Sequence, residues 1–172
     1  AACLASLRPR AIPALYWYAV HLQSLVGLGD ISSQAISDQQ RKTIWSYLLE
    51  VAPDFHGAGP LRYRAVMEAQ HTPPHVAAAQ HWLDKSRAVA PPCLLNDLFE
   101  ARLVSTRRGD QQHFNQRLRS ILQRSTEQSN PSVEDRLVAA QAQWLLERSD
   151  VIFGSVSPAA DPPPLLSTSI GD

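Results

Sequence analysis

Three histidines stand close together in the sequence and could bind a metal ion. His71, His75 and His81 lie within eleven residues, and imidazole nitrogens are common ligands of zinc. However, Pro73 and Pro74 separate the first two histidines, so this pair cannot share a helical face at the (i, i+4) spacing that joint ligation would use. We therefore predict that these histidines are surface or capping residues and that the chain holds no metal and no other cofactor.

Catalytic motifs are absent from the sequence. It contains no glycine-rich phosphate loop, no HExxH motif and no nucleophile elbow. The neighbouring acids Glu134 and Asp135 point apart on a helix, and they suit its first turn better than acid–base catalysis. These observations predict that the protein is not an enzyme and that it acts by binding.

Consecutive aromatic residues form the first part of a candidate binding site. Tyr16, Trp17 and Tyr18 cover about 200° of a helix, so they cannot all face one core. One or two of them must face a groove, a partner or water, and aromatic side chains are favoured as binding anchors. The alternative is that Tyr16 and Trp17 only straddle the edge of the core.

A glycine-rich segment forms the second part of this candidate site. Residues 56–59, His-Gly-Ala-Gly, combine an imidazole with glycines that either serve a sharp turn or let a ligand approach the backbone. Arg62 and Tyr63 follow closely and could line the same mouth, although paired arginines such as Arg62 and Arg64 more often belong to a solvated face. The predicted ligand or partner contacts are Tyr16, Trp17, His21, His56, Arg62 and Tyr63.

Composition limits the class of partner. A chain of 172 residues suits one domain with a continuous core. Sixteen basic residues balance sixteen acidic ones, so no basic face is expected for nucleic acid or for an anionic membrane surface. No apolar run approaches the ~20 residues of a membrane-spanning helix. We expect a protein partner, and the chain could also form a homo-oligomer.

The helices that must position these residues follow a repeating pattern. Residues 45–53 and 82–91 both begin with tryptophan and end in proline, and a weaker copy runs from Phe114 to Pro131. The prolines are 38 and 40 residues apart, a period typical of tetratricopeptide-like repeats. No stretch alternates as a strand would. The sequence predicts an all-α fold in which antiparallel helical hairpins stack as a tetratricopeptide-like array.

Apolar periodicity and capping signals divide the chain further. The second helix is expected to open with a capping box at Ser37, and the fourth with an N-cap at Thr72. The predicted helices are 11–27, 37–52, 61–70, 73–90, 94–106, 111–124 and 132–153. The predicted regions are an N-terminal lead (1–10), a helical domain (11–153) and a proline-rich tail, extended or disordered unless it docks (154–172).

The two cysteines, Cys3 and Cys93, form no CxxC, zinc or haem motif. Cys93 is expected to be a small buried apolar residue, as free cysteines usually are. Ala1-Ala2-Cys3 looks like the end of a bacterial lipobox, in which the cysteine after small residues is lipidated. Cys3 is therefore a candidate lipid anchor that would bring the protein to a membrane surface, and no intact signal peptide is visible in these residues.

The order of several segments resembles a known family. They are residues 14–19 (Ala-Leu-Tyr-Trp-Tyr-Ala), 49–54 (Leu-Glu-Val-Ala-Pro-Asp) and 56–59, and later 78–91 and 139–153. Over residues 14–153 the chain looks like the T component of tripartite ATP-independent periplasmic (TRAP) transporters, the TatT family. This resemblance implies an all-helical bacterial periplasmic protein, often lipid-anchored, with tetratricopeptide-like hairpins.

The resemblance also implies a role. Members of the family are associated with the substrate-binding protein of the transporter, are described as trimers with a hydrophobic cleft and a pore, and are not enzymes. They usually carry further helices before the aromatic segment, whereas thirteen residues precede it here. We therefore expect either a shortened relative or a chain that lacks its amino-terminal part.

Two functions follow as expectations. The first is a non-enzymatic periplasmic binding or scaffold protein of a TRAP-type transporter system, which engages a substrate-binding protein or an apolar ligand through a groove between helices. The second is an accessory structural subunit that clamps a larger bacterial envelope or membrane complex, with the C-terminal tail as a docking strap. Truncation after Phe153 should release an accessory subunit and leave a groove binder intact.

Overall fold

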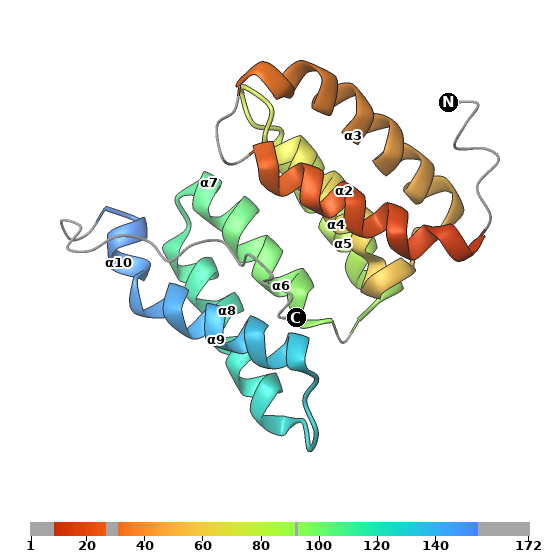
Figure 1. Ribbon diagram of the computed structural model, residues 1–172. Coiled ribbons are helices and arrows are strands. Elements are labelled where there is room, and N and C mark those ends of the chain that lie inside the picture. Colours follow the sequence, from red (N-terminus) through yellow and green to blue (C-terminus); the bar gives the residue numbers. More distant parts are fainter. Residues whose placement is uncertain (1–8, 27–30, 92, 155–172) are drawn as a thin grey trace.

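The computed structural model describes residues 9–26, 31–91 and 93–154, and these residues form helices and no strand (Figure 1). The all-α prediction is therefore confirmed. The elements are η1 (Pro9–Ala11), α2 (Ile12–Val26), α3 (Ile31–Val51), α4 (Phe55–Ala69), α5 (Val76–Val89), α6 (Leu94–Glu100), the π-helical segment η2 (Ala101–Ser105), α7 (Thr106–Arg108), α8 (Gln111–Glu127), α9 (Val133–Glu147) and α10 (Ser149–Ile152).

Helices that follow one another pack as hairpins. α2 packs on α3, α4 packs on α5, and α8 packs on α6 and η2. α9 then covers α6 and α8 at the end of the stack that is blue in Figure 1. The second helix of each hairpin is followed by one of the periodic prolines, which are Pro53, Pro91 and Pro131. One period of the sequence thus corresponds to one helical hairpin.

Aromatic contacts connect the first helices of the three hairpins. Tyr16 in α2 meets Tyr63 in α4, with ring centroids 6.2 Å apart, and Tyr63 meets Phe99 in α6 at 5.9 Å. The buried residues of the other two core clusters are mainly aliphatic, and Phe114 is their one buried aromatic residue in the described part of the chain. None of the helices in the described part of the chain is long and apolar enough to cross a membrane.

Two helix starts follow from local capping chemistry. Ser132 accepts a hydrogen bond from the backbone N–H of Asp135 at 3.0 Å, and the Asp135 carboxylate accepts one from the N–H of Ser132 at 3.3 Å. This capping box opens α9. Asp110 opens α8 in a related way, because its side chain accepts from the N–H of His113 at 2.9 Å.

Two other predicted helix starts are wrong. α3 already begins at Ile31, so Ser37 lies within the helix and is not its cap. The polar run after Ile31 contains neither glycine nor proline, so nothing in it stops a helix. α5 begins only at Val76. A proline disfavours helical backbone in the residue before it, so Pro73 and Pro74 act against helix at Thr72 and Pro73. Both prolines therefore lie in the loop before α5.

Buried charges join the second hairpin to the third. Glu100 and Asp97 lie in α6, and Glu100 is only 2% exposed. Arg87 of α5 pairs with both acids. From α8, Arg117 Nε lies 3.2 Å from Glu100 Oε2, and Arg124 pairs with Asp97. This ion-pair network fixes how α5, α6 and α8 sit against one another, because a displaced helix would leave a buried charge without its partner.

Candidate binding site

The candidate site is built on a left-handed turn between α3 and the right-handed part of α4. His56, Gly57 and Ala58 all have positive φ, at 50°, 58° and 63°. Glycine adopts this backbone freely, whereas histidine and alanine do so at a cost of roughly 1 kcal/mol or more each. Gly57 thus serves a sharp turn, and that turn extends over two residues that are not glycine. Such a turn persists only where its surroundings hold it.

Arg62 holds the left-handed turn from inside the protein. Its side chain is only 1% exposed, and its guanidinium donates hydrogen bonds to the backbone carbonyls of Gly57 and, at 2.8 Å, of His56. It also lies 3.3 Å from Oδ1 of Asn96 and 3.5 Å from Sγ of Cys93. The sequence analysis predicted Arg62 at the mouth of a groove, but the structure places it in the interior. There it donates to the backbone carbonyls of the left-handed turn, because buried carbonyl groups need a hydrogen-bond donor.

Ser86 of the second hairpin and Asn96 of the third complete this buried polar cluster. Ser86 Oγ of α5 lies 2.8 Å from Asn96 Oδ1 and 3.2 Å from the carbonyl of Ala58. The Asn96 amide in turn donates to the carbonyl of Ala90 at 3.2 Å. Sequence reasoning did not find Ser86 or Asn96, because no motif links residues whose contact depends on the packing of two hairpins.

Tyr16 is the centre of an aromatic cluster that packs on the same turn. It is buried, and burial raises the pKa of its hydroxyl. A Cβ on Gly59 would lie 2.3 Å from the Tyr16 hydroxyl oxygen, so the second glycine permits a close approach of α2 to α4. The ring centroids of its aromatic neighbours lie between 5.2 and 6.2 Å away; these neighbours are Trp17, Trp45, Phe55, His56 and Tyr63.

Three parts of the fold meet at one surface, which we call the Trp17 face. It consists of Trp17, His56 and Glu134. Trp17 of α2 is 45% exposed, and its ring centroid lies 5.1 Å from that of His56. Nε2 of His56 lies 3.0 Å from Oε1 of Glu134 in α9. The hydrogen bond from His56 lowers the pKa of the Glu134 carboxyl, although partial burial acts in the opposite direction.

The remaining predicted contacts lie behind or beside this face. Tyr63 is half-buried and stacks on Trp45, with centroids 4.5 Å apart and planes 8° apart. His21 is exposed on α2 and lies outside the aromatic contacts of Tyr16. The structure therefore gathers Tyr16, Trp17 and His56 at one place, with Arg62 and Tyr63 as support and His21 apart. Of the three consecutive aromatics, only Tyr16 faces the core.

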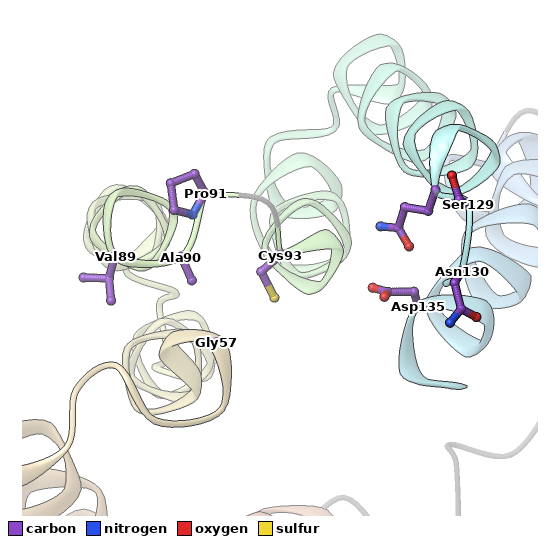
Figure 2. Close-up of a pocket in the computed structure, with 9 residues that line it drawn as sticks. Gly57, Val89, Ala90, Pro91, Cys93, Ser129, Asn130 and Asp135 are labelled. Carbon is purple, nitrogen blue, oxygen red and sulfur yellow. The ribbon is translucent and has the colours of Figure 1, made fainter. Parts of the chain in front are cut away.

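A shallow cleft of about 680 Å³ borders the same turn on the side of Gly57. Figure 2 shows Cys93 and Asp135 reaching into it from opposite walls. Cys93 is only partly buried, so the expectation of a buried apolar cysteine is wrong. The lining comes from the turn, the end of α5 and the α8–α9 connection; it consists of Gly57, Val89, Ala90, Pro91, Cys93, Gln128, Ser129, Asn130 and Asp135.

Comparison with known proteins does not assign the chain to a family. No family model matches it, and no curated protein matches it. The resemblance to the T component of TRAP transporters therefore stays a prediction. Cys3 and residues 155–172 lie outside the described residues, so the lipid anchor and the docking tail also stay predictions.

Proposed function

We propose that this chain is a non-enzymatic binding or scaffold protein of a TRAP-type transporter system in the bacterial periplasm. It engages the substrate-binding protein of that system through the Trp17 face. The observation that carries the proposal is the exposed Trp17 ring, which rests on the aromatic cluster around Tyr16 and on a histidine that contacts Glu134. The transporter system itself comes from the resemblance of residues 14–153.

Trp17 has the properties of a binding anchor. Its ring is held edge-on by Tyr16 at 5.3 Å and by His56 at 5.1 Å. A side chain that is already held loses little conformational freedom when a partner covers it, so more of its contact energy is available for binding. Tryptophan is also among the residue types that most often dominate protein–protein interfaces.

The surroundings of Trp17 extend the same surface. Glu134 is about half exposed at the start of α9, where it contacts His56, the histidine whose ring also contacts Trp17. Val133 and Leu137 are exposed on the same helix, and Leu137 lies one turn beyond Glu134 on the same side. An apolar centre with a polar edge is the usual composition of a protein–protein contact, which supports a protein segment as the partner.

Native mass spectrometry of the protein, isolated gently from its source membranes, tests this function. A pair with a periplasmic substrate-binding protein, or a homotrimer, is the expected result. A fixed stoichiometry with a large membrane complex would instead make the chain an accessory subunit, and truncation after Phe153 should then release it. An added small mass would point to an apolar ligand in place of a protein.

Replacing Trp17 with alanine tests the surface. We expect Trp17→Ala to weaken partner binding by about tenfold or more, because truncating an anchor typically costs over 1 kcal/mol, and to leave the helical circular-dichroism signal unchanged. Tyr18→Ala is the matched control, since Tyr18 is the next residue on α2, is half exposed and makes no ring contact with His56 in the described part of the chain. Equal affinity of the wild type and Trp17→Ala, or collapse of the spectrum, would contradict the proposal.

A further inference from the structure

The loop between α4 and α5 brings two histidines to one carboxylate. Oε2 of Glu68 lies 3.1 Å from Nδ1 of His75 and 3.9 Å from Nε2 of His71. The three ligand atoms all lie within 4.8 Å of one another. Tetrahedral zinc, with bonds of about 2.0–2.1 Å, places its ligand atoms roughly 3.4 Å apart. Small side-chain rotations would therefore bring all three atoms to coordination distance.

We propose that Glu68, His71 and His75 form a binding site for a transition-metal dication of the zinc type. Two imidazole nitrogens and one carboxylate oxygen suit Zn²⁺ and related ions, whereas Mg²⁺ and Ca²⁺ prefer oxygen ligands throughout. The side chains of His71 and His75 are each about half exposed. An ion can therefore enter from solvent, and its fourth coordination position faces water.

The backbone of the loop is already organised around Glu68. Its carbonyl oxygen accepts hydrogen bonds from the N–H of His75 at 3.0 Å and from the N–H of His71 at 3.4 Å. The two imidazole rings stack, with centroids 4.3 Å apart and planes 17° apart. Pro73 and Pro74 restrict the backbone between the histidines. Little chain ordering is thus left for an ion to impose when it binds.

Arg64 determines which carboxylate oxygen is available. Its Nη2 lies 2.6 Å from Oε1 of Glu68, one turn away on α4. Oε1 is therefore occupied, and Oε2 is the oxygen that both histidines approach. The arginine charge reduces the attraction for a cation, but it also orients the carboxylate, and hydrogen-bonded carboxylates are the rule among metal ligands.

This site explains why the sequence argument about these histidines was incomplete. His71 and His75 do not share a helix, because α5 begins only at Val76. The loop positions them instead, and the third ligand, Glu68, lies seven residues before His75 on the preceding helix. His81 lies farther along α5 and is not part of the group.

Titration of the untagged full-length chain with Zn²⁺ alone, by isothermal calorimetry, tests the proposal. We expect one ion per chain. His71→Ala and His75→Ala should each lower the affinity by more than about tenfold, since loss of a mere supporting partner already costs that much. His81→Ala is the matched control, because His81 is an exposed histidine outside the group, and it should keep the wild-type affinity. Co²⁺ should give the visible absorption of a tetrahedral site in the wild type and in His81→Ala, but not in His71→Ala or His75→Ala.

Three outcomes would overturn the proposal. They are the absence of stoichiometric Zn²⁺ binding, unchanged affinity in both ligand variants, and an equal loss in His81→Ala. His71→Ala and His75→Ala carry the test because their side chains are half exposed, whereas Glu68→Gln also removes the partner of Arg64 and could unfold the hairpin. The site does not depend on the proposed function, since the probe is the ion and no protein partner is involved.

Discussion

Arg62 and Glu134 hold the turn at His56 from its two sides. Arg62 binds the backbone carbonyls from within the protein, and Glu134 binds the imidazole from the surface. The two contacts differ in strength, because Arg62 is buried and cannot be replaced by water, whereas Glu134 is half exposed and exchanges easily with solvent. Loss of Arg62 should therefore disrupt the turn, and loss of Glu134 should only loosen it.

Glu134→Gln should change how stability depends on pH. The pKa of the Glu134 carboxyl is lowered in the folded protein. The ionised carboxylate therefore contributes fully to folding stability above the ordinary carboxyl pKa of about 4.3. This contribution is lost as the pH falls through the lower pKa of the folded state. The free energy of unfolding, measured with urea, should fall between about pH 5 and pH 3 in the wild type. This fall should exceed that of Glu134→Gln by up to roughly 1 kcal/mol.

The control for this measurement is Glu147→Gln, an exposed glutamate of the same helix. We expect it to keep the pH dependence of the wild type. If Glu134→Gln showed the wild-type dependence as well, the contact with His56 would not persist in solution.

At the scale of elements, the hairpins could be predicted because each helix carries its own signals. The capping residues Ser132 and Asp135 lie within one turn of the helix that they open, and the sequence predicted a helix from residue 132 with Asp135 in its first turn. The turn could not be predicted in the same way. The contact between His56 and Glu134 joins different hairpins, and the role of Arg62 depends on carbonyls that point inward only in left-handed backbone. Such contacts leave no local pattern.

The same reasoning applies to the aromatic run. Periodicity indicated that Tyr16, Trp17 and Tyr18 could not all be buried, but it could not select the buried one. That choice depends on Gly59, whose missing side chain leaves room for Tyr16. The glycine was visible in the sequence, but its partner in α2 was not.

The buried acids of α6 should be the most sensitive charged positions of the fold. Glu100→Gln should lower the free energy of unfolding by about 3 kcal/mol, because it leaves the guanidinium groups of Arg87 and Arg117 without their main partner. Urea denaturation measures this change. Glu127→Gln, on an exposed glutamate of α8, should change stability by less than about 0.5 kcal/mol. Equal effects of both variants would mean that the network contributes little.

At the scale of the whole molecule, stability should be distributed along the stack of hairpins. In a repeat array each hairpin contacts mainly its neighbours, so elements in the middle are held on two sides and those at the ends on one. α6 lies in the middle, since it packs against α5, α8 and α9 and carries the ion-pair network. α10 has four residues and exposes Val151 and Ile152.

Hydrogen exchange followed by mass spectrometry should detect this distribution. The amides of α6 and α8 should exchange most slowly, because they open only with the array, and those of α10 should exchange among the fastest of the described helices. Uniform protection from α2 to α10 would show that the chain unfolds as a single unit. In that case nearest-neighbour packing would not describe its stability.

The left-handed turn contributes to both the Trp17 face and the cleft beside Gly57, which limits how mutations can test these two surfaces one at a time. The turn borders the Trp17 face through His56 and the cleft through Gly57. A substitution in residues 56–58 will therefore disturb both surfaces together, and its phenotype cannot be assigned to either one. Separation-of-function alleles should instead be sought away from the turn, at Trp17 for one surface and in the α8–α9 connection for the other.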